Sequence, residues 1–598
     1  MAGTDKQPTY VFNGILTASY DLPFLEGLSV DGFFSVDEFS KRRKLFSTPY
    51  TLYNYNGGTD TYDPVVAGGG PDQQASLDEE HFNESMKVAN IKLNFDRSFG
   101  GHNIDAFVGY ERSETNSHTF GASRIHYPTT QTPELSQGGA AATDSDNYGS
   151  SYNFTRESFL SRIAYNYQEK YMAEVQMRID GSSNFPKGER FGVFPSISVG
   201  YRISEEPWFE SSFFDDLKIR TSYGKLGNDN IGQFQYYDNY SFNNSYILDG
   251  QLVSGLDLIK LGNPNITWEV ANKTDAGINV KWLDHFTTEI ISFYQDRTRI
   301  LIARNASIPG STGIVNPYDA DPLVPSENIG KVTSQGIELT MGYRNSLERE
   351  FRFGIQGNFT YAKSKIGFID EAPGVLEYQK QTGSPLNTYL LYNAIGIFRT
   401  QDDLNNYPHV PGAQLGDLIY EDINGDGEIT ADDMLRTKYG NIPQMTFGLV
   451  FDASWKNFDV SAVFSGQAQV SQYVLPESGT VGNYYSSWAD NRWSPNNPNG
   501  SYPRVSERSS SAVSGGLYRN NFWLNNAAFL RLKNLQIGYT FTGDWMKKMS
   551  LSNARVYASG FNLFTITEVE DYDPEGSNES GHFYPQQRII NLGLNIEF

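Results

Sequence analysis

Apolar and polar residues alternate along much of the chain, and the last eleven residues, 588–598, show the pattern most plainly. Strand side chains alternate with a period of two, so one face of this segment is apolar. The apolar face consists of Ile590, Leu592, Leu594, Ile596 and Phe598. Soluble strands can alternate in the same way, but a chain that ends in such a strand with a terminal aromatic residue is typical of the closing strand of an outer-membrane β-barrel.

Segments with the same alternation recur from the start of the chain, and we predict about 17 to 18 strands of the length that a membrane-spanning barrel requires. One of the clearest hairpins joins Met445–Trp455 to Phe458–Gly466 through a short turn at Lys456–Asn457. Less regular segments near residues 115 and 235 are included. The others are 10–20, 28–39, 86–99, 103–111, 157–167, 171–180, 191–202, 217–224, 274–282, 287–296, 336–343, 351–361, 529–541 and 554–563.

The connections between these segments differ in length in a regular way, because short turns alternate with long polar stretches. The long stretches are approximately 40–80, 118–150, 228–266, 300–330, 365–442, 467–522 and 566–584. Short periplasmic turns and long extracellular loops are typical of an up-and-down outer-membrane barrel. A soluble multi-domain β protein such as a propeller would instead show a recurring blade motif, and the sequence has none.

Composition agrees with an all-β, antiparallel transmembrane barrel. Only 38% of the 598 residues are hydrophobic, and no run of about 18 apolar residues offers a transmembrane helix. In a barrel strand only every second residue faces lipid, so a polar composition is expected. Aromatic residues make up 14%, and Tyr in particular suits the boundary between lipid and water.

Charge and missing motifs exclude several functions. The net charge of −23 argues against nucleic acid as a partner, because phosphate binding requires clustered Lys and Arg. The absence of Cys excludes disulfides, zinc–thiolate sites and a Cys nucleophile. The sequence has no H-E-x-x-H, G-x-S-x-G or P-loop motif, and its seven His residues are scattered. We therefore expect no enzyme.

One motif in the sequence indicates a metal-binding site. The segment 422–433 fits the D-x-N-x-D-G calcium loop, in which carboxylate and amide oxygens alternate and a Gly permits the tight turn. An acidic, solvated turn is the alternative, and Asp at the last position in place of Glu could weaken binding. We predict a structural Ca²⁺ that fixes a long loop. The predicted ligands are Asp422, Asn424, Asp426, Glu428 (through its carbonyl) and Asp433.

Aromatic and polar residues crowd the long loops, where they suit sugar rings. A flat aromatic face covers C–H surface while neighbouring polar groups hold hydroxyls. The alternative for any one of them is packing that holds the loops together. The predicted substrate-binding residues are Tyr236, Tyr237, Tyr484, Tyr485, Trp488 and Trp493.

Several short sequence segments, which we call phrases, occur in a fixed order and resemble those of the SusC/RagA-type TonB-dependent transporters of Bacteroidetes outer membranes. They cover most of residues 150–598, whereas residues 1–150 fit the barrel less distinctively. The phrases are Tyr171–Phe185, Phe191–Ser196, Leu217–Gly224, Gly227–Asn228, Asn263–Glu269, Asn328–Leu339, Gly440–Gln444, Asn491–Pro498, Tyr502–Arg504, Leu530–Asn534, Tyr557–Phe564 and Asp573–Glu575.

This resemblance implies a 22-stranded barrel filled by an N-terminal plug, which imports oligosaccharides or other large nutrients. It also implies two partners: a SusD-like surface lipoprotein that acts as a lid, and the TonB–ExbB–ExbD complex that drives plug rearrangement. Peptide import of the RagA type is one alternative, and a non-transporting surface binding or structural barrel is another. Glycan and peptide importers share these phrases, because specificity resides in variable loops.

The sequence departs from the family pattern at its start. It shows no plug, no TonB box and no signal peptide, and about four or five strands are missing relative to the family pattern. We therefore expect residues 1–598 to form one partial barrel domain. Its two edges would be unpaired, which lipid does not tolerate, so another segment or polypeptide would have to complete it.

Overall fold

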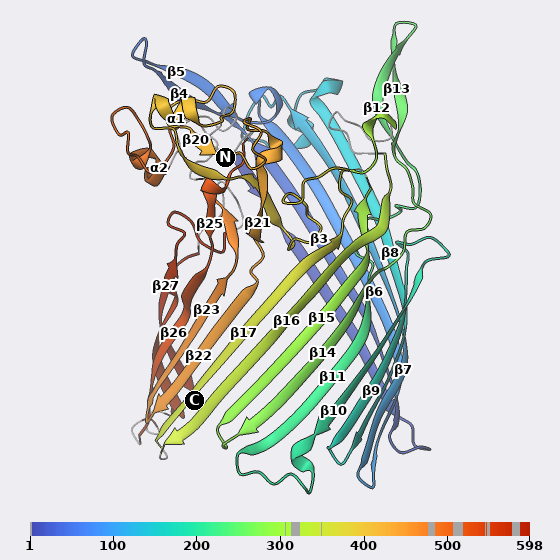
Figure 1. Cartoon of the computed structure of the whole chain (residues 1–598). Coiled ribbons are helices and arrows are strands. Elements are labelled where there is room, and N and C mark those ends of the chain that lie inside the picture. Colours follow the sequence, from blue (N-terminus) through green and yellow to red (C-terminus); the bar gives the residue numbers. More distant parts are fainter. Residues whose placement is uncertain are drawn as a thin grey trace.

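One antiparallel sheet of 18 strands forms the wall of the molecule. The computed structural model describes residues 3–304, 306–312, 323–347, 350–475, 485–505, 518–543, 546, 550–576 and 586–597. Figure 1 shows that the sheet curls around an interior, with β3, β6, β7 and β8 behind the later strands. The strands of the wall are β1 (Gly3–Lys6), β2 (Thr9–Asp21), β3 (Leu28–Ser47), β6 (Ser76–Phe99), β7 (His102–Ile125), β8 (Ser145–Tyr167), β9 (Tyr171–Ser182), β10 (Phe191–Arg202), β11 (Phe214–Asn228), β14 (Glu269–Trp282), β15 (Phe286–Ala303), β16 (Ser326–Leu347), β17 (Phe351–Phe368), β22 (Met445–Trp455), β23 (Phe458–Ala468), β26 (Phe529–Phe541), β27 (Asn553–Thr567) and β28 (Ile589–Glu597).

From β2 onwards, each strand of the wall pairs with the next wall strand along the chain, which is an up-and-down topology. β1 and β2 pair with successive parts of β3, so together they occupy a single strand position in the sheet. Gln7 and Pro8 separate them. Within the described residues, β2 pairs only with β3 and β28 pairs only with β27. These two strands are the edges of the sheet, and the completion of the wall by further strands stays a prediction.

Every regular strand predicted from alternation is present, and the all-β antiparallel class is confirmed. Two details were wrong. Residue 115 is not a separate strand, because β7 continues without a break to Ile125. Residue 235 lies in a loop. Beyond the lipid neither face of a strand has to be apolar, so strand pairing continues where alternation has disappeared.

Short turns lie at one end of the wall and long loops at the other (Figure 1). The predicted hairpin turns at Lys456, whose φ of 53° is left-handed, as a tight two-residue turn requires. The loops contain their own elements: β4 (Pro49–Asn56), β5 (Thr61–Gly68), β12 (Asn239–Leu248), β13 (Gln251–Lys260), β18 (Thr388–Tyr392), β19 (Ala394–Ile397), α1 (Gln401–Asn406), β20 (Leu418–Tyr420), β21 (Met434–Gly440), β24 (Ser471–Tyr473), α2 (Ser486–Asn491), β25 (Leu524–Asn526), and 3₁₀ turns at Pro71–Gln73, Leu135–Gln137, Ala142–Asp144, Gly310–Thr312, Ala431–Asp433 and Asn521–Trp523.

The outer face of the wall is apolar and exposed, as a lipid-facing surface must be. Of the predicted face of the last strand, Ile590, Leu592, Leu594 and Ile596 are exposed, and Phe598 lies outside the described residues. The same face of other strands carries Ile163, Val175, Ile197, Ile219, Ile278, Ile290, Ile337, Ile355 and Leu449, all exposed. Among the described residues no helix is long and apolar enough to cross a membrane.

The largest core of the protein lies in its loops, above the wall. We call it the loop core, and its buried members are Leu391, Tyr392, Ile397, Val410, Leu418, Tyr420, Ile429, Tyr473, Leu475, Trp488 and Trp523. These residues come from the connections β17–β22 and β23–β26, so two long loops fold together as one body. Burial raises the pKa of the Tyr420 hydroxyl, and Asn520 donates a hydrogen bond to it.

Candidate functional site

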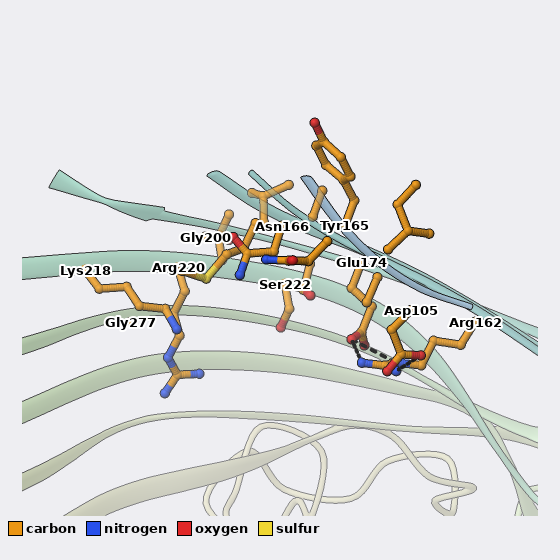
Figure 2. Close-up of a pocket in the computed structure, with 18 of the residues that line it drawn as sticks. Asp105, Arg162, Tyr165, Asn166, Glu174, Gly200, Lys218, Arg220, Ser222 and Gly277 are labelled. Carbon is orange, nitrogen blue, oxygen red and sulfur yellow. Dashed lines mark hydrogen bonds and ion pairs between the residues drawn. The ribbon is translucent and has the colours of Figure 1, made fainter. Parts of the chain in front are cut away.

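The inner face of the wall is polar and carries ion pairs that join neighbouring strands. Figure 2 shows Tyr165 on the opposite side of the sheet from Arg162, Asp105 and Glu174. These three charged side chains line a cavity of about 500 Å³ bounded by strands from β6 to β14. The alternation that makes the outer face apolar therefore leaves the inner face free for donors and acceptors.

A small residue, Ala164, gives the Arg162 side chain room to pair with the carboxylates of Asp105 and Glu174. Ala164 lies directly opposite Asp105 on one side and Glu174 on the other, so two carboxylates flank a methyl group. Arg162, two positions along β8, reaches both: its guanidinium lies 3.0 Å from Asp105 Oδ1 and 2.8 Å from Glu174 Oε2. One cation therefore holds β7, β8 and β9 in register.

Arg220 makes the equivalent bridge on β11. Gly277 lies directly opposite, and a Cβ there would stand 3.3 Å from Arg220 Nε, so the glycine leaves room for the side chain. The guanidinium donates to Asn279 at 3.1 Å and pairs with Glu289 at 2.7 Å. Paired Arg residues give the wall many hydrogen-bonding groups while limiting its local net charge.

A second cavity, of about 790 Å³, continues the first along the same inner face. Arg156 binds the buried Asp229 through two contacts, of 2.9 and 2.6 Å. Asn184 donates to the backbone carbonyl of Asp229 at 2.9 Å. The start of the β11–β14 loop is thereby fixed to the inside of β8, and the two cavities form one polar surface.

We expect Arg162→Gln to lower the free energy of unfolding by about 1 kcal/mol or less, because an ion pair that water reaches contributes little. The Arg162 side chain is 29% exposed and that of Asp105 is 55% exposed. Denaturant unfolding in lipid vesicles, followed by Trp fluorescence, measures the change. The variant Arg220→Gln is the matched case on β11. A decrease in the free energy of unfolding as large as that expected for a buried ion pair would mean that water does not reach the inner face.

The predicted aromatic residues lie in two different places in the structure, and they differ in how exposed they are. Trp488 is fully buried in the loop core, where its indole N–H donates to the Pro503 carbonyl at 2.9 Å. Trp493 packs partly buried against the same core, and Tyr485, 40% exposed, contacts the ring of Tyr572 at 5.2 Å. Tyr484 lies outside the described residues. Of the three predicted residues described near α2, Tyr485 is the most exposed.

The other two predicted residues belong to a different cluster, in the β11–β14 loop. The rings of Tyr236 and Tyr237 lie 4.5 Å apart. Tyr236 packs against a buried cluster that includes Phe185 and Trp268, whereas Tyr237 is 61% exposed. Sugar contact by these tyrosines stays a prediction, and the exposed Tyr237 is best placed to make it.

In the predicted calcium loop, oxygen atoms of the predicted ligands accept hydrogen bonds from the loop's own backbone. Asp422 accepts from Gly425 at 2.7 Å and Gly427 at 2.9 Å. Asp433 is fully buried and accepts from Ile423 and Thr430. The described residues contain no group of three or more His, Cys, Asp or Glu side chains arranged to hold a metal ion. The Ca²⁺ stays a prediction, and backbone capping by the same oxygens is the alternative.

We expect the protein to bind Ca²⁺ and the double variant Asp422→Ala with Asp426→Ala to lose it, because these residues supply side-chain oxygens at two of the loop positions. Equilibrium dialysis against radioactive calcium measures the difference. The control is Asp60→Ala with Asp63→Ala, which removes two carboxylates from the β4–β5 hairpin. Equal binding by all three proteins would contradict the calcium prediction.

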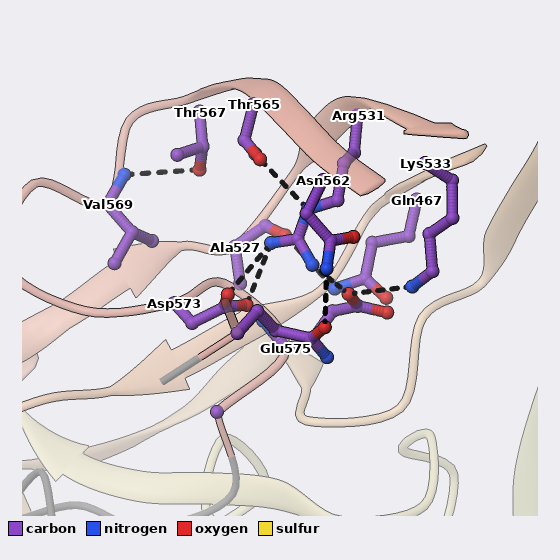
Figure 3. A network of polar contacts seen from close by, with 12 residues as sticks. Gln467, Ala527, Arg531, Lys533, Asn562, Thr565, Thr567, Val569, Asp573 and Glu575 are labelled. Atoms are coloured by element: carbon purple, nitrogen blue, oxygen red, sulfur yellow. Dashed lines mark hydrogen bonds and ion pairs between the residues drawn. The ribbon is translucent and has the colours of Figure 1, made fainter. Parts of the chain in front are cut away.

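A network centred on Arg531 was missed by the sequence analysis (Figure 3). Arg531 on β26 is 1% exposed and donates to both oxygens of Asp573 at 2.9 Å. It also pairs with Glu575 at 2.5 Å, and Thr565 accepts from its Nε at 2.8 Å. Two of the family-like phrases, around residues 530 and 573, contain Arg531, Asp573 and Glu575, but their contact could not be inferred from spacing.

Comparisons with known proteins agree with this geometry. Residues 9–563 match the family model described as "TonB dependent receptor-like, beta-barrel". TonB-dependent receptor P3 of Formosa agariphila is 27% identical over 590 residues, covering 92% of this chain and 56% of that protein. TonB-dependent receptor SusC of Bacteroides thetaiotaomicron is 26% identical over 614 residues, covering 99% of this chain and 56% of that protein. The chain therefore spans about half the length of these relatives.

The solved structures show the same fold. The RagAB peptide transporter superposes with a TM-score of 0.79 at 21% identity, over 99% of this chain and 62% of that chain. A second structure, of the RagAB peptide importer in the "closed-closed" state, has a TM-score of 0.77 at 21% identity and covers 99% of this chain and 63% of its own.

Proposed function

The chain belongs to the TonB-dependent receptor-like β-barrel family, and from this premise we propose that it forms the wall of a transporter that imports a large nutrient across the bacterial outer membrane. The family match over residues 9–563 is the observation that carries the proposal. An apolar outer face and a polar inner face fit a barrel in the outer membrane with a hydrated interior. The function is therefore passage of solute, not chemistry on it.

For the substrate we favour oligosaccharides or other large nutrients. Exposed aromatic rings in the loops, above all Tyr237 and Tyr485, support a sugar ligand, because such rings cover C–H faces while polar neighbours bind hydroxyls. Peptide import is the second candidate, and its support is the printed description of RagAB as a peptide transporter. A surface barrel that binds ligand without transport is the third.

Two partners follow from the proposal. A SusD-like surface lipoprotein would act at the loop end of the wall, where the exposed hairpins and the loop core lie. The TonB–ExbB–ExbD complex would supply energy from the inner membrane, through a plug and TonB box that we place outside the residues of this chain. Both assignments rest on the family and on the two-component name RagAB.

Deletion and uptake test the proposal. We would delete the gene and measure growth on a panel of single glycans and oligopeptides, each given as the only carbon source. We expect the deletion strain to lose growth on one class of compound, either glycans or oligopeptides. The gene should restore this growth, and inactivation of ExbB should abolish it again. Normal uptake of every compound by the deletion strain would favour the non-transporting alternative.

A further inference from the structure

The connection between β10 and β11, residues 203–213, differs from most other turns at its end of the wall. Gly100–Gly101 and Lys456–Asn457 reverse the chain in two residues, whereas this connection contains a 3₁₀ turn (Ile203–Glu205) and an aromatic segment. The aromatic residues are Trp208, Phe209 and Phe213. We call residues 203–213 the foot.

Two of the three rings of the foot are exposed although they are large and apolar, and the third, Phe209, is half-buried. Trp208 is 67% exposed and Phe213 is 43% exposed. Trp208 contacts Phe209 edge to face at 6.1 Å, and Phe209 lies 6.3 Å from Phe214, the first residue of β11. In water these surfaces would lose the stabilisation that burial gives an aromatic side chain.

The rings of the foot continue a belt of aromatic side chains on the outer face of the wall. Phe213 stacks on Trp282 at 5.4 Å, and Trp282 stacks on Phe286 at 4.2 Å. Phe286 contacts Tyr343 at 4.5 Å, and Tyr343 contacts Phe353 at 5.5 Å. Such belts mark the level at which lipid meets water in membrane barrels.

The foot is held in place by hydrogen bonds, so its rings are presented in a fixed position. Leu283 N–H donates to the Phe213 carbonyl at 3.1 Å, which ties the foot to the neighbouring turn. Ser211 Oγ accepts from the backbone N–H groups of Phe213 and Phe214, at 3.1 and 3.0 Å. At the other end, Glu206 accepts from the Tyr171 hydroxyl at 2.5 Å.

We propose that the foot is an interfacial lipid anchor, with Trp208 and Phe213 inserted at the headgroup–glycerol level of phospholipids in the periplasmic leaflet. Short turns face the periplasm in outer-membrane barrels, which places the foot at that leaflet. The rings of Phe214 and Phe213 lie 4.8 Å apart, so ring contacts run without a break from Trp208 through Phe209 to the belt. This series is the argument for lipid as the occupant. The exposed carboxylates of Glu205 and Glu210 stay in water, so the foot lies in the interface and does not cross it.

The absence of Cys makes a clean test possible, because one introduced Cys is the only thiol in this chain. A nitroxide label on Trp208→Cys, in the whole protein reconstituted in phosphatidylethanolamine–phosphatidylglycerol vesicles, reports collision with oxygen and with a water-soluble nickel complex. Ile290→Cys on the lipid-facing side of β15 and Glu169→Cys in the β8–β9 turn are the lipid and water controls.

We expect the label at position 208 to favour oxygen over nickel several-fold more than the label at position 169, and to approach the value at position 290. A ratio equal to that at position 169 would overturn the proposal, because the foot would then lie in water. Protection from both reagents would also overturn it, since a protein surface would then cover the foot. A label at Phe213→Cys repeats the measurement if Trp208→Cys does not fold.

Discussion

Replacing Arg531 with Leu is expected to destabilise the protein by about 3 kcal/mol or more, because it leaves the enclosed carboxylate of Asp573 without its cation and leaves Glu575 paired only with the more distant Lys533. The Arg531 side chain is 2% exposed, and Asp573, at 12%, is nearly as enclosed. Gln472 holds the same loop by donating to the carbonyls of Asp573 and Gly576. The loss should appear as release of the β27–β28 loop, measured by limited proteolysis and by denaturant unfolding.

Removal of the charges separates the role of the ion pair from that of packing. The triple variant Arg531→Leu, Asp573→Asn and Glu575→Gln should recover part of the lost stability, because no buried charge is then left unpaired. Arg97→Leu, which breaks an exposed pair with Glu26, should cost about 1 kcal/mol or less. If Arg531→Leu costs no more than Arg97→Leu, the network of Figure 3 does not fix the loop.

The strands of the wall were predictable because lipid imposes a strict rule on them. Every strand that crosses the membrane must present an apolar residue at every second position, so β9 and β22 are visible in the sequence alone. This rule applies only to the part of a strand that lies within the membrane. The outer half of β7 therefore carried no such signal, although it pairs residue by residue with β8 up to Arg124.

The site was much less predictable, because it depends on which strand positions lie opposite each other. Arg162 and Asp105 are 57 residues apart, and only the pairing of β7 with β8 brings them together. The loop core has the same difficulty: Leu391, Trp488 and Trp523 meet although no periodicity links them. Sequence identified aromatic residues in these loops but could not distinguish a buried ring from one that faces a ligand.

Trp488→Ala is the second substitution with a large expected effect, a loss of about 3–5 kcal/mol, because it removes the largest fully buried side chain of the loop core. Its ring lies 4.7 Å from that of Trp523, and its N–H binds Pro503. Trp488→Phe keeps most of the apolar contact and leaves one carbonyl unpaired, so a smaller loss of about 1–3 kcal/mol is expected. Denaturant unfolding followed by fluorescence of the remaining Trp residues measures both.

Comparison with Tyr485→Ala decides between packing and ligand contact for the predicted aromatic residues. Tyr485 is 40% exposed, so its loss should leave the free energy of unfolding within about 1 kcal/mol while weakening binding of the transported solute. Trp488→Ala should lower stability and binding together, because the loop body that presents Tyr485 depends on the loop core. If Trp488→Ala weakens binding but leaves stability unchanged, Trp488 contacts the ligand directly, and the loop core must then open when the ligand enters.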